Sequence, residues 1–67
     1  MNALLRLPAV TARVGLSRSA VYLLIKRGDF PAPVPLGGRA VAWVSSEIDQ
    51  WIMGKIQQRQ ERPGTTV

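Results

Sequence analysis

The sequence contains no cysteine, no histidine and only four acidic residues. Without cysteine there is no disulfide framework and no thiolate metal site, and without histidine the commonest metal ligand and general base is missing. Glu47 and Asp49 stand two positions apart in a predicted helix, so they do not face each other as a catalytic acid/base pair would. Asp29 falls in a predicted turn and Glu61 in the polar end of the chain. We therefore expect a protein that is not an enzyme and uses no cofactor and no metal.

Long apolar runs are also missing. No stretch approaches the roughly 20 apolar residues of a membrane span, and the segment around Arg6 lacks the apolar core of a secretion signal. The absence of both features favours a cytoplasmic protein with no membrane partner.

What the chain does contain is enough apolar material for one small folded domain. Its 67 residues are 46% hydrophobic, and a domain of this size buries about 60% of the surface that the unfolded chain exposes. Pro63 and Gly64 prevent a helix from continuing to the end. We expect a domain over residues 1–60 and a flexible tail over residues 61–67.

Positively charged residues outnumber acidic ones in the sequence. The formal net charge is +5, and all nine cations except Lys26 and Lys55 are arginines. The planar guanidinium fork suits phosphate groups and guanine edges. A basic balance is also common on solvated surfaces, so the positions of the arginines must decide what they do.

The first half of the chain predicts two helices joined by a tight turn. Pro8 fits the first turn of a helix, and Leu7, Val10 and Val14 recur at helical spacing up to Gly15. Gly15 can adopt the left-handed conformation that ends a helix.

The second helix is predicted to begin at Ser17, a good N-cap, and to end at Gly28. Its apolar face consists of Val21 and of the residues three and four positions later, Leu24 and Ile25. A second row, at i+4 spacing, carries cations and an aromatic ring without any acid: Arg18, Tyr22 and Lys26.

The second half predicts a hairpin. Two short apolar runs, residues 34–36 and 40–44, are joined by Gly37-Gly38, a dipeptide typical of two-residue hairpin turns. Pro35 cannot donate to a strand ladder, so the first run should be an edge strand.

A third helix follows, with Ser45 or Ser46 as its cap. Ser46 and Asp49 fit a capping-box pattern. We assign Trp43 and Trp51 to the core rather than to base stacking, and we expect Leu23 and Met53 to be exposed. The apolar stripe of this helix should close the core through Ile48, Trp51, Ile52 and Ile56.

Together these elements predict a mainly α protein with a small β-hairpin: a winged helix-turn-helix of three helices and a two-stranded antiparallel wing. The second helix would enter the major groove of double-stranded DNA, with donors in its first turn for base edges and cations further on for phosphates. The wing tip would reach the backbone or the minor groove. The candidate DNA-binding residues are Ser17, Arg18, Ser19, Tyr22, Lys26, Arg27, Gly37, Gly38 and Arg39.

Four stretches also carry a family resemblance: RLPAV from Arg6, GLSRSAVY from Gly15, IKRGDFPAPVPLGGRAVAW from Ile25 and SEIDQW from Ser46. With them the chain resembles the AlpA family of short phage and prophage regulators, which is similar to MerR-like winged-helix proteins and to phage excisionases. The resemblance implies a non-catalytic DNA-binding regulator whose base-reading helix is residues 17–27 and whose wing tip is residues 37–39. The position of Leu23 is often basic in such sequences.

Three kinds of function follow from these observations. The leading one is a sequence-specific transcriptional regulator of a phage or mobile element, which would work at the nucleoid. The second is an excisionase-like architectural factor that assists an integrase. The third is a protein-binding adaptor, such as an antitoxin or packaging subunit. A single module this small makes a limited contact with DNA, so we expect further copies of the chain to associate on it. An integrase or RNA polymerase is the other expected partner, as the family resemblance implies.

Overall fold

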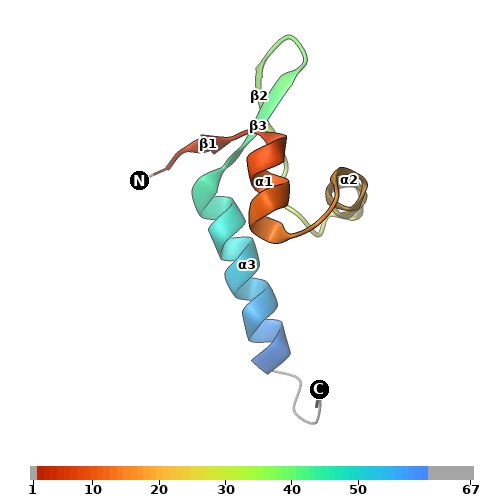
Figure 1. Ribbon diagram of the computed structural model, residues 1–67, viewed down its shortest axis with the longest axis vertical. Helices are drawn as coiled ribbons and strands as arrows, with labels where there is room; N and C mark the ends of the chain where they lie inside the picture. The colour runs from red at the N-terminus through yellow and green to blue at the C-terminus, as the bar shows by residue number, and fades with distance from the viewer. Residues whose placement is uncertain (1, 61–67) are drawn as a thin grey trace.

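The computed structural model describes residues 2–60, and residues 61–67, where the sequence predicts a flexible tail, lie outside that range. Figure 1 shows a hairpin at one end of the molecule, a long helix running towards the other, and two short helices beside their junction. This arrangement confirms the predicted winged helix-turn-helix. The elements in chain order are β1 (Leu4–Leu5), α1 (Leu7–Val14), α2 (Arg18–Arg27), β2 (Val34–Gly37), β3 (Ala40–Val44) and α3 (Ser45–Gln60).

The turn between α1 and α2 forms where the sequence predicts it. Gly15 takes a φ of 71°, which other residues rarely adopt, and its N–H donates to the Thr11 carbonyl at 2.9 Å. The Ser17 hydroxyl then accepts a bond from the Ala20 N–H at 3.1 Å and caps α2. Because this connection is so short, α2 turns sharply across α1, and Figure 1 shows α1 from the side and α2 end-on.

The sheet has one strand more than the sequence predicts. β3 lies in the centre, with β2 antiparallel on one side and β1 antiparallel on the other. Pro35 does lie in an edge strand, where its missing N–H costs no ladder bond, and the register slips between Pro35 and Gly37. In β1, Leu4 pairs with Val44. A strand of two residues has no periodicity, so its pairing is visible only in the folded molecule.

The core lies where α1, α2 and α3 meet β3. Trp43, assigned to the core from the sequence, is fully buried, and its indole N–H donates to the Pro31 carbonyl at 3.0 Å. Phe30 packs edge-to-face on Trp51, with ring centroids 4.9 Å apart. These contacts fix the segment between α2 and β2 to the core. The buried residues are Val10, Val21, Phe30, Ala42, Trp43 and Ile48.

The start of α3 uses its polar residues differently from the predicted capping box. The Ser45 hydroxyl accepts a bond from the Ala3 N–H at 2.8 Å and so holds the chain beside β1. The Asp49 carboxylate accepts from the Arg13 guanidinium at 3.0 Å and ties α3 to α1. Both side chains of this ion pair are well exposed, so it adds little to stability.

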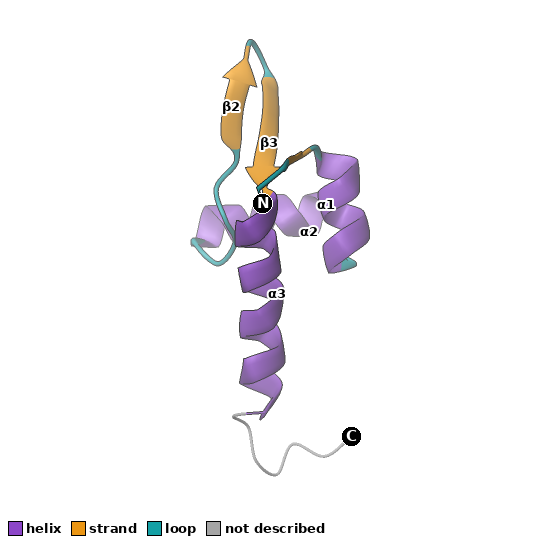
Figure 2. Cartoon of the chain, turned by 90° about the vertical axis from the view of Figure 1, so that its left-hand side faces the viewer, coloured by secondary structure: helices purple, strands orange, loops and turns teal. Residues whose placement is uncertain are grey.

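The second half of α3 extends beyond the core. Ile48 is buried, but Ile56, predicted to continue the same stripe, is 36% exposed, and Met53 is 56% exposed, as expected. Figure 2 shows α3 leading away from the body on the side opposite the hairpin. No helix within residues 2–60 is both long enough and apolar enough to span a membrane.

Candidate nucleic-acid interface

The polar residues that the sequence predicts to contact DNA lie at the N-cap of α2 and along that helix. All six are exposed, while Val21 of the same helix is buried. α2 contains three cations and no acid. The exposed set is Ser17, Arg18, Ser19, Tyr22, Lys26 and Arg27.

The wing tip presents the other three predicted residues, and each of them is exposed. Gly38 has a φ of 57°, so the tip depends on glycine for its conformation. Arg39 follows in the turn, just before β3. In Figures 1 and 2 this tip is the free end of the hairpin, so nothing within the described residues covers it.

A pocket joins the helices to the wing. Its volume is about 300 Å³, and three structural units supply its walls: the start of α1, the first half of α2 and the hairpin. Arg18 and Tyr22 of α2 meet Arg39 of the wing in it. We call it the arginine pocket; its lining is Arg6, Leu7, Pro8, Arg18, Tyr22, Arg39 and Val41.

Tyr22 connects the arginine pocket to the core. The residue is 39% exposed, and its ring lies edge-to-face against buried Trp43, with centroids 6.4 Å apart. The Arg18 guanidinium carbon lies 6.0 Å from the Tyr22 ring centroid, at the limit of a cation–π contact. Tyr22 therefore packs on the core through Trp43 and remains partly accessible at the surface.

The arginine pocket gathers only part of the predicted set. Ser17, Ser19, Lys26 and Arg27 lie elsewhere along α2, and Gly37 and Gly38 lie further out on the wing. The Ser17 hydroxyl is already engaged in capping α2.

Arg6 belongs to this site although sequence reasoning did not select it. It immediately precedes α1 and is the cap residue of that helix, with an exposed side chain that makes no capping bond. The signal was present, because Arg6 begins the first of the stretches that carry the family resemblance. Its approach to the wing could not be inferred, since residues 6 and 39 come together only through the fold.

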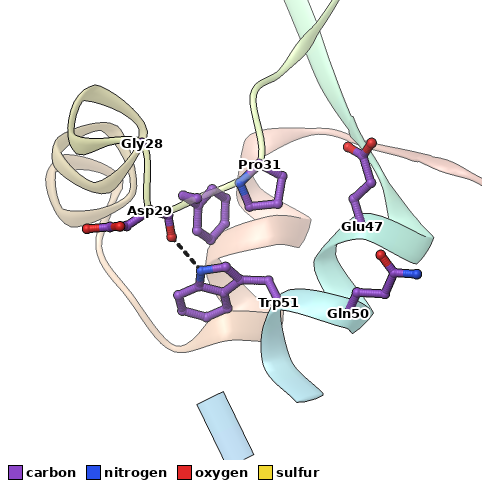
Figure 3. Close-up of a pocket in the computed structure, with 7 residues that line it drawn as sticks. Gly28, Asp29, Pro31, Glu47, Gln50 and Trp51 are labelled. Atoms are coloured by element: carbon purple, nitrogen blue, oxygen red, sulfur yellow. Dashed lines mark hydrogen bonds between the residues drawn. The ribbon is translucent and has the colours of Figure 1, made fainter. Parts of the chain in front are cut away.

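A second pocket, of about 530 Å³, lies between the segment after α2 and the start of α3. Figure 3 shows the side chains of Asp29 and Glu47 on opposite sides of the Trp51 indole, whose N–H donates to the Asp29 carbonyl at 2.7 Å. The two carboxylates therefore do not converge as an acid/base pair would. Within residues 2–60 no cluster of three acids could hold a metal ion.

A third concave region, of about 360 Å³, lies between α1 and α3. It is more apolar than the arginine pocket and has cations at its rim. Lys55 at that rim lies over the Trp51 ring, 5.2 Å from its centroid. The residues lining it are Arg13, Val14, Trp51, Ile52, Lys55, Ile56 and Arg59.

The tight turn, the exposed cationic second helix and the basic wing define a small winged helix-turn-helix protein. The chain belongs to the AlpA family: residues 3–56 match the sequence model described as prophage CP4-57 regulatory protein (AlpA).

Two relatives illustrate the range of the family. The chain is 51% identical over 55 residues to the uncharacterised protein ORF88 of enterobacteria phage P4, an alignment that covers 82% of this chain and 62% of that protein. It is 38% identical over 55 residues to the DNA-binding transcriptional activator AlpA of Escherichia coli K12, covering 73% of this chain and 79% of AlpA.

Proposed function

We propose that this protein is a sequence-specific DNA-binding transcriptional regulator of a phage or other mobile element. One relative is named a DNA-binding transcriptional activator, and the alignment with it extends over most of the chain. The polar residues on α2 and on the wing are those that a duplex-binding protein needs.

In the proposed complex α2 lies in the major groove and the wing contacts the adjoining backbone or minor groove. The observation that carries this proposal is the arginine pocket, where Arg18 of α2 and Arg39 of the wing line one cavity. Because residues of both elements line the same cavity, a single duplex can contact both at once. The DNA-contacting residues in this proposal are Ser17, Arg18, Ser19, Tyr22, Lys26, Arg27, Gly37, Gly38 and Arg39.

The experiment is a selection from randomised duplex DNA at moderate salt. Arg27→Glu is compared with Arg59→Glu, because each replaces an exposed arginine in the last turn of its helix with the same acid. We expect the wild type and Arg59→Glu to enrich one motif and Arg27→Glu to retain almost no DNA, since of the two arginines only Arg27 lies on the proposed DNA-facing helix.

Two results would contradict the proposal. Equal loss in both variants would mean that net charge, and not α2, determines binding. Retention without any enriched motif, abolished by moderate salt, would leave nonspecific electrostatic attraction alone. That second result would favour a protein-binding adaptor, because the molecule also exposes apolar side chains such as Leu23.

The same selected duplex separates a transcriptional regulator from an excisionase-like factor. A regulator requires only that its site overlap a promoter, whereas an architectural factor must bend the site and bring an integrase to it. A gel-shift comparison of duplexes with the motif at the centre and at the end reports the bend. We expect no difference in mobility between the two positions, and a clear difference would reassign the protein to the architectural class.

A further inference from the structure

We infer that Arg6, Arg18 and Arg39 form a clasp that holds one backbone phosphate of the duplex between the wing and the starts of α1 and α2. This inference rests on the proposed function and goes further by naming the ligand of the arginine pocket, a backbone phosphate. It also adds Arg6 to the interface. It assigns Arg18 to the backbone, whereas the sequence alone places it at a base edge.

The first argument is electrostatic. Three arginines from distant parts of the chain line one pocket whose lining includes no acid. Within residues 2–60 the one ion pair joins Arg13 to Asp49, so none of the three has a carboxylate partner there. Like charges gathered in this way repel one another. An anion in the pocket would convert that repulsion into attraction.

The second argument is chemical. Guanidinium groups bind phosphate oxygens through paired N–H donors, and the Tyr22 hydroxyl in the same pocket is a further donor. Leu7 and Pro8 belong to the first turn of α1, which has no acid and no side-chain cap, so the positive end of that helix adds to the potential. The pocket therefore presents charged donors and a positive potential, which suit an anion.

The third argument is the position of the arginines. The Arg18 guanidinium lies over the Tyr22 ring, and that ring packs on Trp43 beneath the wing. Arg39 lines the same pocket from the wing. Both residues therefore border the space between helix and wing. A duplex lying across α2 would bring a strand of its backbone over this space.

The pocket is large enough to admit a phosphate group. Its volume of about 300 Å³ leaves room for the adjoining part of the backbone as well. The clasp would therefore fix the register of the duplex against α2 and the wing without reading its sequence.

The first test uses inorganic phosphate alone. Phosphate is added to isotope-labelled protein at constant ionic strength, and the side-chain N–H signals of the arginines are followed by NMR. We expect the signals of Arg6, Arg18 and Arg39 to shift together with one dissociation constant, while those of Arg27 and Arg59 stay in place. Equal shifts of all five signals would mean general ion pairing and would overturn the clasp.

The second test uses DNA and the charge-matched variants Arg6→Ala and Arg59→Ala. Arg6→Ala should weaken binding to every duplex by roughly tenfold or more, because it removes a charged hydrogen bond, and Arg59→Ala should not. Arg6→Lys should restore only part of the loss, since an ammonium lacks the bidentate fork. Equal affinities for Arg6→Ala and Arg59→Ala would overturn the inference.

The dependence of affinity on salt distinguishes one phosphate from three. The slope of log K against log salt counts neutralised phosphates, at about 0.9 for each. Replacing Arg6, Arg18 and Arg39 together should therefore lower the slope by about 0.9. A fall of about three times that value would mean three separate backbone contacts and no clasp. Because all three side chains are exposed, the triple variant should fold, and circular dichroism checks that it does.

The clasp and the proposed function can fail separately. If the selection enriches a motif but Arg6→Ala binds like the wild type, the regulator stands and the clasp falls. If no motif is enriched but phosphate shifts the three arginines, the clasp stands as an anion site and sequence-specific regulation falls.

Discussion

At the scale of single residues, Tyr22 connects the stability of the domain to its candidate interface. Its ring touches buried Trp43 on one side and carries the Arg18 guanidinium on the other. Tyr22→Ala removes both contacts and exposes the Trp43 edge, so we expect the free energy of unfolding to fall by about 1 to 2 kcal/mol. Urea titration followed by tryptophan fluorescence measures the change.

Tyr22→Phe is the matched control, because it removes only the hydroxyl. Its free energy of unfolding should stay within about 0.5 kcal/mol of the wild type, while its affinity for the selected duplex falls through loss of the donor at the arginine pocket. If Tyr22→Phe and Tyr22→Ala unfold at the same urea concentration, the packing of this ring on Trp43 contributes nothing to stability.

At the scale of elements, identical substitutions at two glycines should have opposite effects. Gly15 ends α1 at a φ of 71°, a conformation that a side chain disfavours, although space for a Cβ is present. Gly54 lies inside α3 at an ordinary helical φ, also with open space for a Cβ. We expect Gly15→Ala to destabilise the fold by about 1 kcal/mol and Gly54→Ala to stabilise it by about 0.5 to 1 kcal/mol.

Thermal unfolding followed by circular dichroism measures both changes against the wild type. The two stability changes are expected to have opposite signs. This makes the test strict, because a general effect of added methyl groups would move both melting temperatures in the same direction. A stabilised Gly15→Ala would mean that the turn between α1 and α2 does not need the left-handed conformation.

The elements that could be predicted from the sequence are those with a local signal. Gly15 and Ser17 mark the turn between the first two helices, and Gly37-Gly38 marks the hairpin, because caps and turns depend on neighbouring residues. β1 could not be predicted, since Leu4 pairs with Val44 across most of the chain.

The residues of the candidate site also divide into those with a local signal in the sequence and those brought together only by the fold. The row of cations on α2 is visible in the sequence because helical periodicity places Arg18, Tyr22 and Lys26 on one side. That Arg6 and Arg39 line one pocket with α2 is a tertiary feature, which depends on how the start of α1 lies against the wing. Asp49 is a similar case, because its partner Arg13 comes from another helix.

At the scale of the whole molecule, the size of the domain limits how tightly one copy can hold DNA. A single module of this kind buries about 600 to 1,000 Å² of its surface on a duplex. We therefore expect further copies to bind side by side on the natural site. Leu23 is the proposed contact between them, because it is an apolar side chain that is 49% exposed on α2.

Leu23→Ser tests this contact, with Met53→Ser as the control because Met53 is similarly exposed but lies on α3. Neither change should alter the free energy of unfolding by more than about 0.5 kcal/mol. Sedimentation on the selected duplex should detect more than one copy of the wild type and of Met53→Ser, and a single copy of Leu23→Ser, because the apolar surface between neighbours is lost. Single copies of the wild type at saturation would disprove self-association. An unchanged stoichiometry with an altered motif would instead place Leu23 against a thymine methyl group in the major groove.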